Sequence, residues 1–67
     1  MDMMKSYVLS NVFAGRGAYA GLAGGEAYSA ATKACSDLIA AGHITRDLKA
    51  VTESGRATLL NGEPSNN

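Results

Sequence analysis

Apolar residues recur at helical spacing in two long stretches of the chain. The first covers residues 3–14, where Asp2 is placed to cap the N-terminus and glycines follow the last apolar residue. The second covers residues 27–41, has polar side chains opposite its apolar face, and is followed by Gly42 as a C-terminal cap. The apolar face of this second helix is predicted to consist of Ala27, Ala31, Ala34, Cys35 and Leu38, with Tyr28 and Ile39 at its edge.

Between these two helices, residues 18–25 are short and rich in small side chains. Tyr19 and Leu22 can hold one or two helical turns there, before Gly24 and Gly25 force the chain to turn. We therefore expect at most a short helix in this segment.

After the second helix, the pattern no longer has helical spacing. Residues 44–51 are too short and too polar for another helix and predict two short strands joined by a turn, with Ile44 and Leu48 facing inward. Thr52 then caps a last helix that ends at residues 61–62. The predicted fold class is mainly α with a small β-hairpin and three to four helices.

Length and composition favour one small domain. The chain has 67 residues, which predicts a single domain over residues 1–61 and a disordered polar tail over residues 62–67. Aromatic residues make up only 6% of the chain and much of its apolar content is alanine. So small a core favours a partner or a second copy.

Charge and cysteine content narrow the function further. Lysine and arginine number 6, as do aspartate and glutamate, so the chain lacks the strong positive charge of many DNA-binding domains. A single cysteine excludes an internal disulfide and a multi-cysteine zinc site, and predicts a reducing, cytoplasmic location. No apolar run approaches the ~20 residues that cross a bilayer, so we expect no membrane association.

Residues that carry chemistry do not cluster in the sequence. His43 is the only histidine and has no cluster of cysteines or acids around it, and Cys35 is expected to be a buried small hydrophobe. The segment GRGAYAGLAGG has the glycines of a phosphate-binding loop but lacks its Gly-Lys-Ser/Thr. A leader peptide ending at Gly24 and Gly25 is disfavoured by the polar, helical remainder. We expect no enzymatic activity, no cofactor and no metal ion.

The order of elements over residues 18–60 resembles the winged helix-turn-helix regulators, particularly the MarR- and PadR-like branches. In those families the recognition helix ends in a Leu-x-x-x-Gly-x-Ile pattern, and a wing and a Leu-Thr-x-x-Gly-Arg pattern follow. The segment AYAGLA resembles the short second helix of that motif. The other matching residues are Leu38, Gly42 and Ile44, and then Val51, Thr52, Gly55 and Arg56, with Val51 in place of leucine.

This resemblance implies a small DNA-binding transcriptional regulator in a bacterial or phage cytoplasm. A recognition helix lies in the major groove and reads base edges with its exposed side chains. The predicted contacts to double-stranded DNA are Ser29, Thr32, Lys33 and Ser36 on the helix, Arg46 and Lys49 on the hairpin, and Arg16 before the second helix.

An alternative from another class is a protein-interaction module on the same fold, such as a small phage-type inhibitor or adaptor. The two hypotheses differ in the surface that they require. A continuous positive strip through Lys33, Arg46 and Lys49 would favour DNA, whereas an exposed apolar patch would favour a protein partner.

The first helix carries more apolar side chains than so small a core can be expected to cover. These residues are Met4, Val8, Val12 and Phe13. We therefore predict a homodimer in which this helix packs against its copy.

Overall fold

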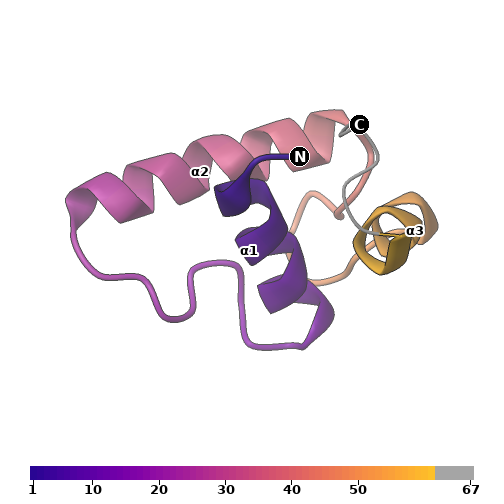
Figure 1. The fold of residues 1–67 in the computed structure, drawn as a ribbon, viewed down its shortest axis with the longest axis horizontal. Helices are drawn as coiled ribbons and strands as arrows, with labels where there is room; N and C mark the ends of the chain where they lie inside the picture. Colours follow the sequence, from indigo (N-terminus) through magenta and orange to yellow (C-terminus); the bar gives the residue numbers. More distant parts are fainter. Residues whose placement is uncertain (62–67) are drawn as a thin grey trace.

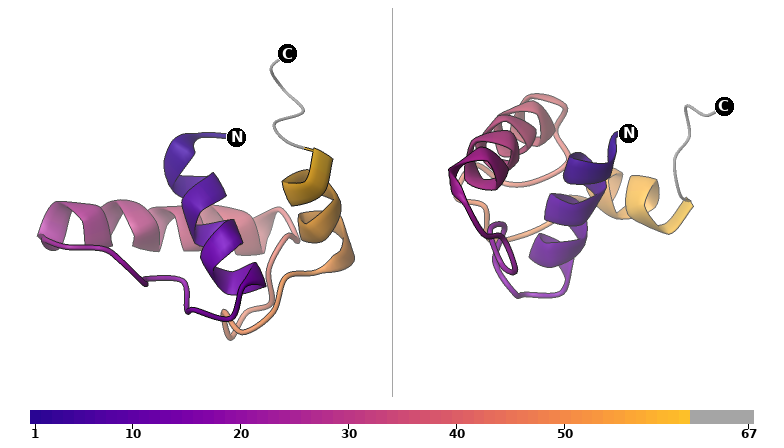
Figure 2. Two further views of the ribbon diagram at one scale, coloured as in Figure 1. Left: turned by 60° about the horizontal axis from the view of Figure 1, so that its bottom comes forward. Right: turned by 60° about the vertical axis from the view of Figure 1, so that its left-hand side comes forward.

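Over residues 1–61, which the computed structural model describes, the chain forms three helices and no strand. These are α1 (Met3–Phe13), α2 (Gly25–Ala40) and α3 (Glu53–Asn61). α1 crosses α2 and packs against both other helices (Figures 1 and 2). The predicted mainly helical class is confirmed, while the tail predicted over residues 62–67 lies outside the described residues.

α1 begins and ends close to where the local sequence predicts. The Asp2 carboxylate accepts a hydrogen bond from the Lys5 backbone N–H at 2.8 Å, a cap of the kind that stabilises a helix by about 0.5–2 kcal/mol. The N–H of Ala14 donates to the Ser10 carbonyl at 3.0 Å. Gly15 then turns the chain away with a φ of +79°.

The apolar residues of α1 that were predicted to contact a second copy are mostly buried within one chain. Val8 is 0% exposed and Val12 is 4% exposed, while Met4 is partly buried against the core. These side chains are covered because α1 lies between α2 and α3 and packs against both helices (Figure 2). The basis of the dimer prediction is therefore wrong for these three residues, and of the four only Phe13, at 49%, is exposed.

The short second helix that the resemblance implies for the segment AYAGLA, residues 18–23, does not form. Residues 14–24 run as turns, in which the Ala20 N–H donates to the Gly17 carbonyl at 3.1 Å. Gly17 and Gly21 have φ values of +100° and +78°, which a right-handed helix excludes. The buried Asn11 side chain holds the loop instead, because its Nδ2 donates to the Ala20 carbonyl at 3.0 Å and to the Ala18 carbonyl at 3.4 Å.

α2 is the longest helix, and four of the five residues predicted for its apolar face are buried, while Ala27 is half-buried and Tyr28, predicted at the edge, is exposed. Ala31, Ala34, Cys35 and Leu38 are all at most 4% exposed. They form one core with Val8, Leu9, Val12, Ala18 and Ile44. The helix begins two residues earlier than predicted and ends one residue earlier, at Ala40.

The predicted two-stranded hairpin is reduced to one antiparallel bridge, between Ile44 and Val51. A tight turn leaves too little chain for strands, because the Leu48 N–H donates to the Thr45 carbonyl at 3.0 Å. The Thr45 hydroxyl also accepts a hydrogen bond from the Ala50 N–H at 3.2 Å. This N–H is therefore not free to donate to a backbone carbonyl of a neighbouring strand. Ile44 is nevertheless buried and Leu48 packs against the core, as expected, and Val51 packs against the core as well.

α3 is held on the turn that follows α2 by the residues of the Gly-x-Ile and Thr-x-x-Gly patterns. The Thr52 hydroxyl donates to the Gly42 carbonyl at 2.6 Å, and the Thr52 N–H donates to the His43 carbonyl at 3.0 Å. The same hydroxyl accepts from the Gly55 N–H at 3.1 Å, which caps α3. A Cβ at Gly55 would overlap the His43 carbonyl oxygen and lie 2.9 Å from Val51 Cγ1. Packing alone thus requires a glycine here.

None of the helices within residues 1–61 has the length and apolar character needed to cross a membrane.

Candidate interaction surfaces

Three of the residues predicted to contact DNA share the outer face of α2. Ser29, Lys33 and Ser36 are exposed and lie opposite the buried residues of this helix. Glu26, on the first turn, is exposed as well. The outer face of α2 is therefore polar, made of small side chains, and weakly charged.

Thr32 is used differently from these three residues. Its hydroxyl donates to the Tyr28 carbonyl at 2.9 Å and lies 3.0 Å from the Tyr19 hydroxyl. The rings of Tyr19 and Tyr28 stack at a centroid distance of 5.2 Å. Burial raises the pKa of the neighbouring Cys35 thiol, and a hydrogen bond with Tyr19 acts in the opposite direction. Thr32 therefore helps to fix the loop to α2.

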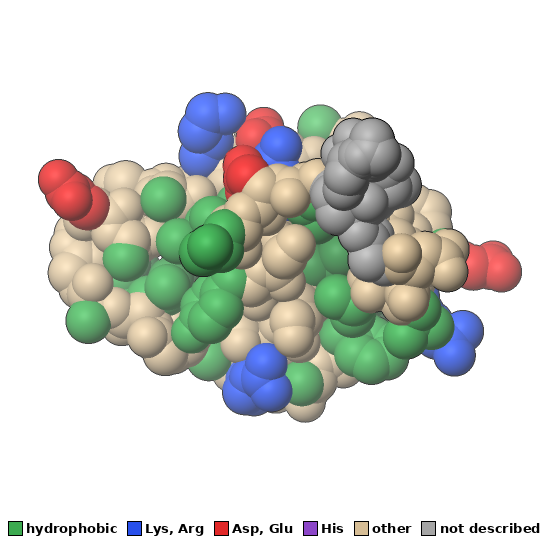
Figure 3. All heavy atoms as spheres, in the orientation of Figure 1, with side chains coloured by type: hydrophobic (Ala, Val, Ile, Leu, Met, Phe, Trp, Pro, Cys, Tyr) green, Lys and Arg blue, Asp and Glu red, His purple; other side chains and the backbone are tan. Residues whose placement is uncertain are grey.

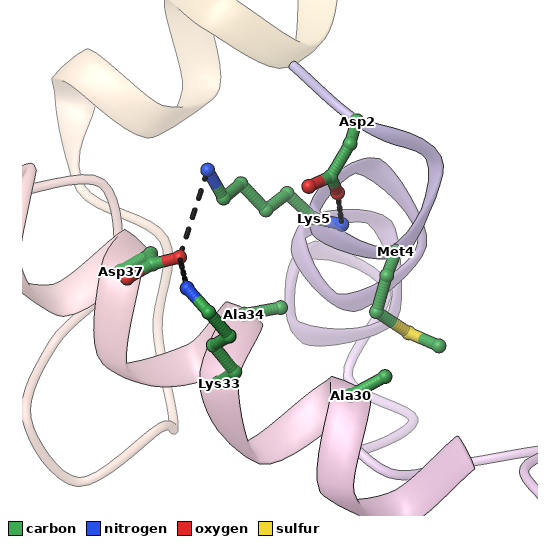
Figure 4. Close-up of a pocket in the computed structure, with 7 residues that line it drawn as sticks. All are labelled: Asp2, Met4, Lys5, Ala30, Lys33, Ala34 and Asp37. Atoms are coloured by element: carbon green, nitrogen blue, oxygen red, sulfur yellow. Dashed lines mark hydrogen bonds and ion pairs between the residues drawn. The ribbon is translucent and has the colours of Figure 1, made fainter. Parts of the chain in front are cut away.

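Lys33 is exposed but paired. Its Nζ donates to Asp37 Oδ2 at 3.2 Å, one helical turn away, and the Lys5 Nζ reaches the same oxygen from α1 at 3.7 Å (Figure 4). Exposed ion pairs of this kind contribute only about 0.2–1 kcal/mol to stability. Their larger effect is on the local charge, because the Asp37 carboxylate offsets one of the two positive charges of Lys5 and Lys33.

The same residues line a small pocket between the start of α1 and the middle of α2 (Figure 4). Its volume is about 210 Å³, below the ~300–1,000 Å³ typical of small-molecule sites. The Asp2 carboxylate that faces it is already the cap of α1. The lining residues are Asp2, Met4, Lys5, Ala30, Lys33, Ala34 and Asp37.

Arg46 and Lys49 are exposed in the turn after α2, with an acid between them. Asp47 Oδ1 accepts hydrogen bonds from the Thr45 hydroxyl at 2.6 Å and from the Lys49 N–H at 3.1 Å. The Thr45 hydrogen bond first, and the Lys49 N–H second, lower the pKa of Asp47. The ionised Asp47 therefore reduces the positive charge of this turn.

Arg16 is anchored to the end of α1. Its Nε donates to Asn11 Oδ1 at 2.9 Å, and its backbone N–H donates to the Asn11 carbonyl at 3.0 Å. The buried Asn11 in turn bonds the loop, as described above. Arg16 thus has a structural role in positioning the loop.

The structure does not bring the predicted basic contacts together. Lys33 lies beside the start of α1 (Figure 4), whereas the turn that carries Arg46 and Lys49 lies toward the other end of α1 (Figure 2, left). On the face drawn in Figure 3, basic side chains appear at separate margins and acidic ones lie among them. No continuous positive strip runs across this face.

One surface of α1 was not predicted from the sequence, and we call it the outer face of α1. It consists of Met3, Ser6, Ser10 and Phe13. Met3 is 86% exposed and Phe13 is 49% exposed, while Ser6 is exposed and Ser10 is half-buried. The signal was their spacing of three, four and three residues, which places them on one side of a helix.

The outer face of α1 carries no charge. Lys5 is the sole charged residue within Met3–Phe13, and its Nζ extends toward Asp37 of α2. In Figure 3, the surface over α1, at the centre of the view, is hydrophobic or neutral and charged side chains lie around it.

A short hydrogen bond joins the turn to α3. His43 Nδ1 lies 2.7 Å from Ser54 Oγ. Within residues 1–61, no hydrogen bond to a carboxylate orients this imidazole, as a nucleophilic triad would require. We assign the contact to the attachment of α3.

No family model, curated protein or solved structure matches the chain. A function for this chain is therefore inferred from the surfaces described above.

Proposed function

We propose that the chain is a protein-interaction module that acts through the outer face of α1, by contact and without chemistry. The observation that carries this proposal is an uncharged helix face that exposes Met3 and Phe13. Burial of apolar surface drives association between proteins, whereas contact with DNA depends on cations. A small regulator of the inhibitor or adaptor kind, in a bacterial or phage cytoplasm, fits such a surface.

We also propose that the scaffold is a shortened winged helix-turn-helix. The contacts of Gly42, Thr52 and Gly55 support this, because the residues that match the winged helix-turn-helix pattern are the ones that attach α3 to the turn. The turn over residues 45–50 takes the place of the wing. The second helix is replaced by the glycine turns that Asn11 holds.

A photo-crosslinking amino acid, placed at either of two positions in the full chain, tests the proposed function. At position 6 it lies on the outer face of α1, and at position 29 it lies on the outer face of α2. We expect protein adducts from position 6 and none from position 29, after irradiation in cells. DNA adducts from position 29, without protein adducts from position 6, would contradict the proposal.

Binding to double-stranded DNA is a second candidate, favoured by the exposed Ser29, Lys33 and Ser36 on one helix face. If Lys33 reads a base, Lys33→Ala weakens specific binding by about 1–3 kcal/mol. Arg46→Ala and Lys49→Ala weaken binding to all sequences, and each flattens the salt dependence by about one unit.

Asp37 supplies a matched variant for the DNA candidate. Asp37→Asn removes the carboxylate that pairs with Lys33 and Lys5, so it should strengthen DNA binding where Lys33→Ala weakens it. The measurement is a mobility shift over a range of salt concentrations. Absence of duplex binding at low salt excludes this candidate.

A further inference from the structure

The outer face of α1 has the same order of side-chain sizes when it is read from either end. Met3 and Phe13 are the large residues at its two ends, and Ser6 and Ser10 are the small residues between them. The spacings of three, four and three residues are symmetric about the middle of the helix. A surface of this kind is complementary to itself across a two-fold axis.

An antiparallel crossing of two α1 helices uses this symmetry. With the axis at the centre of the face, Met3 of one copy meets the partner's Phe13, and Ser6 meets the partner's Ser10. The serines are small enough for the two backbones to approach, as close helix packing requires. The pairing of Met3 with an aromatic ring also gives a favourable contact between sulfur and ring.

Charge favours a second copy as well. The face itself is uncharged, and the whole chain has 6 basic and 6 acidic residues, so two copies carry no net charge to repel each other. A partner recognised by charge would have nothing to pair with on this face.

We propose that the chain forms a homodimer in which the outer faces of two α1 helices pack antiparallel. This rests on the proposed function, since it names a second copy as the partner of that surface. The outer face of α1 thus takes the place of the dimer contact predicted from the sequence, because Val8 and Val12 of that predicted contact are buried within one chain.

The area available makes this dimer a weak one. From their exposed fractions, Met3 and Phe13 together offer on the order of 250 Å² per copy, at roughly 200 Å² for a large side chain. Two copies then bury about 500 Å² through these residues, so even with the surrounding surface the interface lies at the low end for specific contacts. We expect a dissociation constant between about 10 µM and 1 mM.

Sedimentation velocity of the full chain over that concentration range tests the proposal. Phe13→Ser and Met3→Ser should each weaken the dimer at least about tenfold, which corresponds to 1.4 kcal/mol. Leu60→Ser is the matched control, because Leu60 is a 62% exposed apolar residue on a different helix, α3, and its loss should leave the dimer unchanged. Circular dichroism checks that each variant keeps its helices.

Disulfide trapping tests the orientation. In a mixture of a Ser6→Cys chain and a Ser10→Cys chain, the antiparallel arrangement predicts that the mixed disulfide exceeds both symmetric ones. Predominance of the symmetric disulfides overturns the antiparallel arrangement.

The sedimentation results separate failure of this inference from failure of the proposed function. A monomer at every concentration, or equal weakening by Leu60→Ser, overturns the dimer. If the chain is monomeric but position 6 still crosslinks to another protein, the proposed function stands and the partner is a different one. If position 6 crosslinks to no protein at all, both fail.

Discussion

Substitution of Gly55 by alanine should destabilise the protein, although alanine is the better helix former. The added Cβ would overlap the His43 carbonyl oxygen and lie 2.8 Å from the carbonyl carbon, so α3 has to move. That movement weakens the hydrogen bond from the Thr52 N–H to the same carbonyl, which is 3.0 Å long.

The magnitude follows from three effects. Overpacking costs about 1–3 kcal/mol, and loss of a hydrogen bond costs about 1 kcal/mol. The higher helix propensity of alanine returns about 1 kcal/mol. We expect a net loss of about 2 kcal/mol, which lowers the Tm of a domain of this size by roughly 8–16 °C.

Gly25→Ala is the control for this prediction. Gly25 is also helical, but apart from its chain neighbours and the backbone of its own helix no atom lies within 4 Å of a Cβ built there. Its replacement should leave the protein as stable or stabilise it by up to about 1 kcal/mol. Thermal and urea unfolding, followed by circular dichroism, measure both variants. If Gly55→Ala is as stable as the parent, α3 is not held on the turn in the way described.

Three further predictions concern the loop, the turn and the ion pair. Asn11→Ala leaves the buried Ala18 carbonyl without its Asn11 donor and the Ala20 carbonyl with the Tyr7 hydroxyl alone. It should cost about 1–3 kcal/mol in urea unfolding, and an unchanged midpoint would mean that Asn11 does not hold the loop. The pKa of Asp47 is lower in the folded protein than in the unfolded chain, so the ionised carboxylate stabilises the fold. This stabilisation is fully present above the unfolded pKa of about 3.9 and is lost as the pH falls through the lower folded pKa. An NMR titration of the Lys49 amide should follow this step, and Asp47→Asn should abolish it. Lys33→Ala should change the free energy of unfolding by less than about 0.5 kcal/mol, since its pair with Asp37 is exposed; a larger loss would show that the pair is structural.

The parts of the fold that the sequence predicts are those governed by neighbouring residues. Asp2 and Gly15 bound α1, and the alternation of small and polar residues defines the buried face of α2. The loop after α1 was mispredicted because its form depends on the sign of φ at Gly17 and Gly21. The hydrogen bonds of Asn11 that stabilise it join residues seven and nine positions apart.

The candidate surfaces needed the tertiary structure. The spacing of Val8 and Val12 shows that α1 has an apolar face, but not that α2 and α3 cover it together. Likewise, Lys33 is the sole cation of α2, but its pairing beside Lys5 depends on how the two helices cross. Sequence spacing locates a helix face, and only the packing decides whether that face is free.

The attachment of α3 determines where this protein can be lengthened. The bond from Thr52 to the Gly42 carbonyl and the bridge between Ile44 and Val51 close the base of the turn over residues 45–50. Residues inserted at the exposed tip, between Arg46 and Asp47, would leave that base intact. Doubling the loop would cost only about 0.6 kcal/mol in closure entropy. An engineer, or natural selection, can therefore add a longer basic arm here by insertion alone, without redesigning the helices.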